Sequence, residues 1–145
     1  MTSVDFYFNA ADRLEVACRL AGKAHAQRKR VLVYAPDGDA AVRISRLLWT
    51  WQATAFVPHC MAQDALADET PVLITTDAHT PPACEILLNL SAACPPHFER
   101  FERVLEVVDG DAAGLDAGRE RFRFYRDRGY PIARHDLTQG RARGR

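Results

Sequence analysis

Five arginines are interspersed with aromatic residues in one short segment near the C-terminal end, RERFRFYRDRGY at residues 119–130. The guanidinium group of arginine is a planar fork of donors that matches a carboxylate or a phosphate. Aromatic faces accommodate apolar groups. A surface that carries both is suited to a ligand that is acidic and also has an apolar end. No other segment offers chemistry as well defined, so the first functional hypothesis depends on this one.

Helical spacing places some of these residues together. On a helix, Arg119, Arg123 and Arg126 fall at i, i+4 and i+7, along one stripe. Phe122 falls on a neighbouring stripe with Leu115, between an apolar side and the basic stripe. A peptide that ends in acids and an aromatic residue would set its carboxylates on the guanidinium groups and its ring against Phe122. We therefore predict a tail-peptide site at Arg119, Phe122, Arg123 and Arg126.

Charge is distributed unevenly along the chain, although the net charge is zero. Residues 115–145 contain nine arginines against four acids, whereas the rest has ten bases against fifteen acids. Such asymmetry indicates an anionic partner, with a solvated helical face as the alternative interpretation. Single-stranded nucleic acid is a rival ligand, because arginine and aromatic residues also bind single strands. The zero net charge argues against it, since phosphate binding usually leaves a strongly basic footprint.

A second candidate surface lies in the segment LWTWQATAFVPH, which holds Trp49, Phe56, Val57 and Pro58. Trp51 falls on the apolar stripe of the preceding helix. Trp49 is two residues away, about 200° around the helix, and cannot share that face. An exposed tryptophan beside Phe56 is typical of a protein interface, while burial of all these residues is the alternative. We predict a protein-binding interface at Trp49, Phe56, Val57 and Pro58.

Motifs for enzyme chemistry are missing. No GxxxxGK[ST] loop or GxSxG elbow occurs, and the turn PDGD at 36–39 places two carboxylates where a phosphate would lie. His59 and Cys60 are adjacent, so on an extended segment they point to opposite faces. His79 and Cys84 lack the spacing of a metal site with that pair. The sequence predicts no cofactor, and a nucleotide-dependent or Cys/His enzyme remains the alternative class.

Six apolar-rich segments predict β-strands, and helical patterns follow the first, second and fifth of them. The predicted strands are residues 4–8, 30–35, 72–75, 85–90, 103–108 and 132–137. Asn9 is predicted to cap the first helix, with Asp12 as a weaker partner. The alternation predicts an α/β fold, a Rossmann-like layered domain with a largely parallel sheet, helices on both faces and no phosphate-binding loop. We expect one domain over 1–137 and a basic flexible tail over 138–145.

The chain has features of a cytoplasmic protein. No apolar stretch approaches the roughly 20 residues that a membrane span needs, so no membrane contact is predicted. Charged residues interrupt the N-terminal region, so no secretory signal is expected. The four cysteines show no CxxC spacing, which indicates free thiols in a reducing compartment.

The order and spacing of several segments resemble the chi subunits of bacterial DNA polymerase III, a family of clamp-loader accessory proteins. The resemblance extends from the first strand to about Leu137. The segments that carry it are DRLEVACRLAGKA, KRVLVYAPD, LWTW followed by FVPH, EILLNL, FERFERVLEVVD and RERFRFYRDRGY. It implies a non-enzymatic replisome adaptor with a Rossmann-like fold and no nucleotide site.

The resemblance also implies partners. Members of this family bind the acidic C-terminal tail of single-stranded DNA-binding protein, which ends in a Pro-Phe carboxylate, so DNA would be reached only indirectly. Arg119 and Phe122 match the family's RERY-like motif, with Phe where a Tyr can occur, and Leu115 stands where some members have a basic residue. Arg123 and Arg126 would supply the surrounding positive field.

A second partner is implied for the other surface. In this family it binds the psi subunit, which connects chi to the clamp loader, and in some members an XPD-like helicase competes for it. The matching residues here are Trp49, Phe56, Val57 and Pro58.

Overall fold

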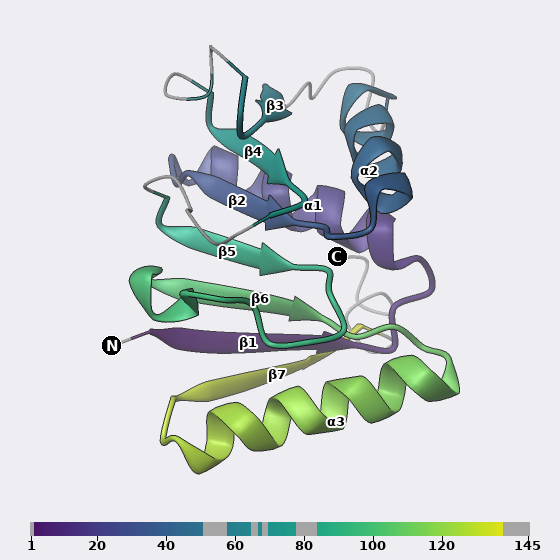
Figure 1. Ribbon diagram of the computed structural model, residues 1–145, viewed down its shortest axis with the longest axis vertical. Helices are drawn as coiled ribbons and strands as arrows, with labels where there is room; N and C mark the ends of the chain where they lie inside the picture. Colours follow the sequence, from purple (N-terminus) through teal and green to yellow (C-terminus); the bar gives the residue numbers. More distant parts are fainter. Residues whose placement is uncertain (1, 51–57, 65–66, 68–69, 78–83, 138–145) are drawn as a thin grey trace.

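A seven-stranded sheet forms the centre of the molecule, and every neighbouring pair of its strands runs parallel (Figure 1). The computed structural model describes residues 2–50, 58–64, 67, 70–77 and 84–137. The strands are β1 (Ser3–Phe8), β2 (Val31–Tyr34), β3 (His59–Met61), β4 (Val72–Thr75), β5 (Ile86–Asn89), β6 (Arg103–Val107) and β7 (Ile132–Asp136). Their order across the sheet is β3-β4-β2-β5-β6-β1-β7. The predicted α/β class is confirmed.

Within these described residues, three α-helices cover the two faces of the sheet. They are α1 (Arg13–Ala26), α2 (Gly38–Thr50) and α3 (Ala112–Asp127), with a short 3-10 turn η2 at Phe98–Arg100. The apolar sides of α1 and α2 share one core with the sheet. The apolar side of α3 packs into a second core on the opposite face, so α3 stands apart from the other two helices (Figure 1).

Strand β2 shows how the sheet is buried on both faces. Val31 and Val33 belong to the core beneath α1 and α2, whereas Leu32 belongs to the core on the α3 face. All three side chains are completely buried. Successive side chains of a strand point to opposite faces, so a continuous apolar run is what a doubly covered parallel strand requires.

Most predicted elements are confirmed within two residues at each end, but two details were wrong or missed. Asp12, not Asn9, caps α1: its carboxylate accepts hydrogen bonds from the amides of Leu14 and Glu15, at 3.1 and 3.3 Å. Asn9 instead adopts a left-handed conformation, with φ of 62°, and donates to Asp136 at 3.0 Å. Strand β3 was also missed, because three residues are too few for a period-2 pattern to be recognised.

Helix α3 begins seven residues before the arginine-rich segment and is held close to the sheet. Its N-cap is Asp111, whose carboxylate accepts from the amide of Gly114 at 2.6 Å. A methyl group added at Gly118 would lie 2.8 Å from Cγ1 of Val108. The helix can therefore approach the end of β6 only because residue 118 has no side chain.

Candidate functional site

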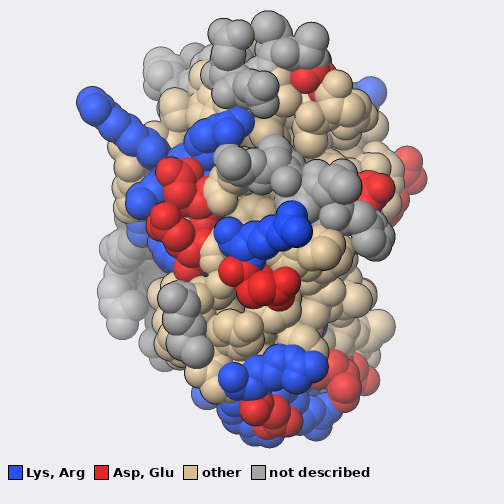
Figure 2. Space-filling view, turned by 60° about the vertical axis from the view of Figure 1, so that its left-hand side comes forward, with Lys and Arg blue, Asp and Glu red and all other residues tan. Residues whose placement is uncertain are grey.

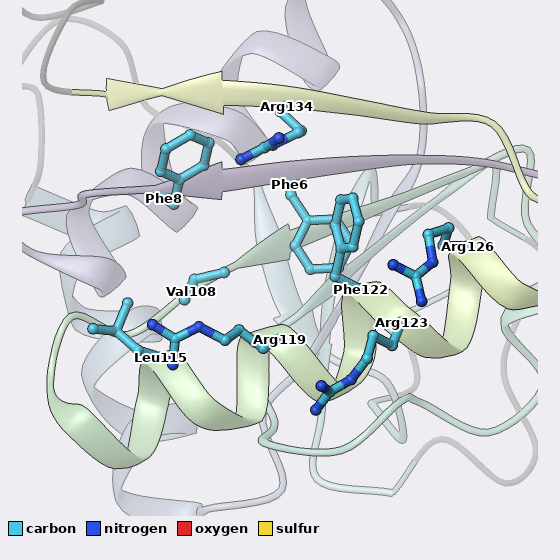
Figure 3. A pocket seen from close by; sticks show the side chains of 10 residues that line it. Phe6, Phe8, Val108, Leu115, Arg119, Phe122, Arg123, Arg126 and Arg134 are labelled. Carbon is cyan, nitrogen blue, oxygen red and sulfur yellow. The ribbon is translucent and has the colours of Figure 1, made fainter.

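A pocket with a volume of about 500 Å³ lies between α3 and the neighbouring strands β1 and β7 (Figure 3). Its lining residues are Phe6, Phe8, Val108, Leu115, Gly118, Arg119, Phe122, Arg123, Arg126 and Arg134. We call it the α3 pocket. All four residues predicted for the tail-peptide site line it, and they come together because they share one side of the helix.

The floor of the α3 pocket is aromatic. The rings of Phe6 and Phe122 meet edge to face, with centroids 5.4 Å apart. Phe6 is buried and Phe122 is half-buried, so the floor is anchored in the core while part of it stays open. Phe8 and Val108 extend this apolar surface. It can hold an apolar or aromatic group of a ligand.

The rim of the pocket on the helix side is basic. Arg119 pairs with Asp116 at 2.9 Å, Arg126 pairs with Asp127 at 3.0 Å, and Arg123 pairs with Glu120. Basic and acidic side chains accordingly lie side by side at the end of the molecule formed by α3 (Figure 2). Exposed pairs of this kind contribute little to stability, so a ligand carboxylate can compete for these guanidinium groups.

Sequence reasoning missed the part of the pocket that comes from the sheet. Phe6 and Phe8 belong to β1, and Arg134 belongs to the edge strand β7. The guanidinium carbon of Arg134 lies 5.7 Å from the ring centroids of both Phe8 and Phe122. The only sequence signal for this arginine is its spacing: Arg134 is two residues after Ile132, so in a strand the two side chains lie on the same face.

On its sheet side, α3 is fixed by a buried polar network around Glu106. Nε of Arg121 and the hydroxyl of Tyr125 each donate to a different oxygen of the Glu106 carboxylate, at 2.7 Å. The amide nitrogen of Asn89 donates to the same two oxygens, at 2.9 and 3.1 Å. The exposed fraction is zero for Glu106, Asn89 and Tyr125, and 4% for Arg121. The network connects α3 to both β5 and β6.

Burial also changes the acidity of this network. Desolvation is the largest cause of the raised pKa of Glu106, and the cation of Arg121 and the donors Tyr125 and Asn89 oppose it. Desolvation and the adjacent carboxylate together raise the pKa of Tyr125. The Tyr125 hydroxyl therefore stays protonated at neutral pH and keeps donating to Glu106.

The sheet register places this network beside the α3 pocket. Phe6 of β1 lies opposite Glu106 of β6 on one side and opposite Arg134 of β7 on the other. Neighbouring residues in a parallel ladder project from the same face, so one row contains the anchor of α3, the pocket floor and the far rim. The anchoring of Arg121 thus determines which way Arg119 and Phe122 face.

The second predicted surface is seen only in part. Trp49, on α2, is 62% exposed, and Val42 is 52% exposed. Val42 precedes Trp49 by seven residues, so the two side chains lie on the same side of the helix. The Trp49 ring lies edge-on to His59, with centroids 5.4 Å apart. Pro58 is half-buried, whereas Phe56 and Val57, like Trp51 and the predicted tail 138–145, lie outside the described residues.

The other candidate chemistry is seen only in part, because His79 lies outside the described residues. Within the described ranges, no three His, Cys, Asp or Glu side chains are grouped so that they could hold a metal ion. Burial raises the pKa of the Cys18 thiol to about 12, and that of Cys84 and Cys94 to about 11. Such thiols are protonated at neutral pH and are poor nucleophiles. No helix in the part of the chain that the structure describes is long and apolar enough to span a membrane.

Solved structures with a similar fold include the C-terminal domain of the DEAD-box protein Dbp5, with a TM-score of 0.60 and 14% identity. That match covers 94% of this chain and 90% of the other. A structure of S. cerevisiae Dbp5 bound to RNA and ADP BeF3 matches with a TM-score of 0.65 and 13% identity, over 94% of this chain and 41% of the other. At this level of identity the similarity concerns the fold alone.

Sequence comparisons are more specific. The family described as DNA polymerase III chi subunit, HolC, matches residues 1–133. The DNA polymerase III subunit chi of Pseudomonas aeruginosa is 38% identical, over 96% of this chain and 99% of that protein. The chi subunit of Escherichia coli is 27% identical, over 81% of each chain. The fold, the predicted family segments and these matches agree, and the chain belongs to the chi subunit family of DNA polymerase III, a replication accessory subunit.

Proposed function

We propose that this chain is a non-catalytic adaptor, which links the clamp loader to single-stranded DNA-binding protein by binding the acidic C-terminal tail of that protein in the α3 pocket. One observation carries the proposal. Arg119, Phe122, Arg123 and Arg126 line a single open cavity whose floor is aromatic. Family membership supplies the replisome context.

The chemistry of the pocket fits a peptide that ends in an aromatic residue. A terminal phenylalanine ring can lie against Phe6 and Phe122 while its carboxylate reaches a guanidinium group. Acidic residues further back along the peptide would follow the basic side of α3. The guanidinium groups already hold Asp and Glu side chains in the free protein, so their geometry suits carboxylates.

Calorimetric titration with a synthetic acidic peptide ending in Pro-Phe tests the proposal. Arg119→Ala should weaken binding by roughly 1.5–3 kcal/mol, the range for a hydrogen bond to a charged group. Arg43→Ala is a matched control, because it also removes an exposed arginine from a helix but lies on α2. Unchanged affinity of the Arg119 variant would remove this residue from the site.

A second binding assay, with single-stranded oligonucleotide, distinguishes the proposed peptide binding from direct binding of nucleic acid. The purified chain alone should bind single-stranded oligonucleotide much more weakly than it binds the peptide. Peptide binding should also weaken as salt increases, because part of the attraction is Coulombic. Tight oligonucleotide binding without any other protein would favour the rival function. A thermal-shift screen with nucleotides covers the enzyme alternative, since a true ligand raises native-state stability.

We further propose that the surface around Trp49 and Val42 binds the partner subunit, psi or an XPD-like helicase. The supporting observation is that two large apolar side chains are exposed on the same side of α2. Exposed tryptophans are common among the residues that dominate binding at interfaces. Trp49→Ala should abolish copurification of the partner and leave tail-peptide affinity unchanged. Loss of both activities would indicate a misfolded variant rather than a lost interface.

A further inference from the structure

Arg134 differs from the three arginines on the helix side of the α3 pocket. Arg119, Arg123 and Arg126 each pair with a carboxylate on α3. In the part of the chain that the structure describes, no carboxylate lies within ion-pair distance of Arg134. A ligand must compete with an internal partner at the other three positions. At Arg134 it meets a guanidinium group that has no such partner among the described residues.

Arg134 also differs from the helix arginines in its position. It projects from β7 on the side of the pocket opposite Arg119, so the two arginines approach the opening from two walls (Figure 3). Its guanidinium carbon is 5.7 Å from both Phe8 and Phe122. The cation therefore lies at the edge of the aromatic floor, where a bound ring would be close to it.

This position favours one particular carboxylate of a peptide. In a C-terminal aromatic residue, only Cβ and Cα separate the ring from the α-carboxylate. A ring held on the floor of the pocket brings that α-carboxylate to the edge of the floor. Acidic side chains earlier in the peptide are several bonds further away. We propose that Arg134 binds the α-carboxylate of the ligand from the wall opposite Arg119, and so selects a free C-terminus.

This inference rests on the proposed tail-peptide function, and it makes β7 part of the recognition surface. The guanidinium groups of Arg119 and Arg134 lie on opposite walls, so they can contact one carboxylate from both sides. Arginines on a single helix face cannot do this. Bidentate guanidinium contacts also depend on geometry, so lysine at this position should restore only part of the affinity.

Binding of two peptides to four proteins tests the inference. The peptides share one acidic Pro-Phe sequence and end in either a free carboxylate or an amide. The proteins are the unmodified chain, Arg134→Ala, Arg134→Lys and the control Arg43→Ala, all checked by thermal unfolding. With the free carboxylate, Arg134→Ala should bind about tenfold more weakly, the size of effect expected for one hydrogen bond to a charged group. With the amide, Arg134→Ala and the unmodified chain should bind equally, because the group that Arg134 recognises is gone.

The outcomes separate the two levels of the proposal. If the unmodified chain binds neither peptide, the proposed function itself fails. If it binds the free peptide and Arg134→Ala binds as well as Arg43→Ala does, only the role of Arg134 is overturned. An equal loss for the free and the amidated peptide also overturns it, because Arg134 would then contribute only a general positive field. Arg134 is exposed on an edge strand, so its substitution leaves the core intact.

Discussion

Helix α3 carries arginines on two sides, which differ in burial and in where their partners lie. On the sheet side, Arg121 is 4% exposed, and it donates to Glu106 and to the carbonyl of Ala92. On the open side, Arg119 and Arg123 are exposed and pair with acids one turn away on the same helix. Two positions along the chain therefore separate a buried arginine with a structural role from an exposed one that we propose binds the ligand.

The difference shows that residue type does not decide the role of a charge, whereas burial and partners do. A buried carboxylate is costly unless cations and donors surround it, so Glu106 makes the position of Arg121 strongly specified. An exposed pair costs little to break, so Arg119 and Arg123 remain available to a ligand. The buried side fixes the orientation of the helix, and this orientation makes Arg119 and Arg123 face the α3 pocket.

The largest expected effect is on the buried side. Arg121→Met should lower the free energy of unfolding by about 3–5 kcal/mol, because it leaves the Glu106 carboxylate buried without its cation. Urea denaturation followed by circular dichroism measures this change. Arg123→Met, on the same helix, is the matched control and should cost less than about 1 kcal/mol. Equal costs for the two variants would refute the division of α3 into two sides.

A second substitution tests the cause of that loss. Glu106→Gln removes the charge but keeps a carbonyl oxygen that can accept from Tyr125. Combined with Arg121→Met, it should recover part of the lost stability, since no unpaired charge then remains buried. A double variant that is even less stable than Arg121→Met would mean that packing, and not charge, accounts for the loss.

The next largest effect should come from Tyr125. Tyr125→Phe keeps the ring contacts with Phe6 and Phe98, whose centroids lie 6.0 and 5.2 Å away, but removes the hydroxyl that donates to Glu106. We expect a loss of roughly 1.5–2 kcal/mol, the lower part of the range for hydrogen bonds to charged groups. Tyr130→Phe is the control, because the Tyr130 ring also packs on Phe98 but its hydroxyl has no hydrogen bond to the described residues. Similar losses for both would show that the network adds nothing beyond packing.

The same two sides separate what the sequence predicted from what it could not. Helical periodicity depends only on local spacing, so it correctly grouped Arg119, Phe122, Arg123 and Arg126 on one side of α3. It could not identify Arg121 as buried, because its partner Glu106 lies in a distant strand, RVLEV, between Leu105 and Val107.

Arg134 was missed for a related reason. It joins the pocket only because β7 pairs with β1, and this pairing brings together residues about 130 positions apart. Strand order depends on the packing of the whole domain and leaves no local pattern in the chain. Asn9 was misassigned for a more local reason, since two capping residues lie within four positions and only the backbone path selects between them.

The smallest expected effect should complete the comparison on the open side. Arg123→Ala removes a pair with Glu120 in which both side chains are exposed, so stability should change by less than about 0.5 kcal/mol. Tail-peptide affinity should fall about threefold, because one cation leaves the rim of the pocket while the contacts of Arg119 and Phe122 remain. The salt dependence of binding should become shallower, since fewer charges then contribute to the attraction. Titrations at two salt concentrations, with Arg43→Ala alongside, measure both quantities. If Arg123→Ala lowers stability as much as Tyr125→Phe does, the open side of α3 also has a structural role, and the contrast between its two sides is one of degree.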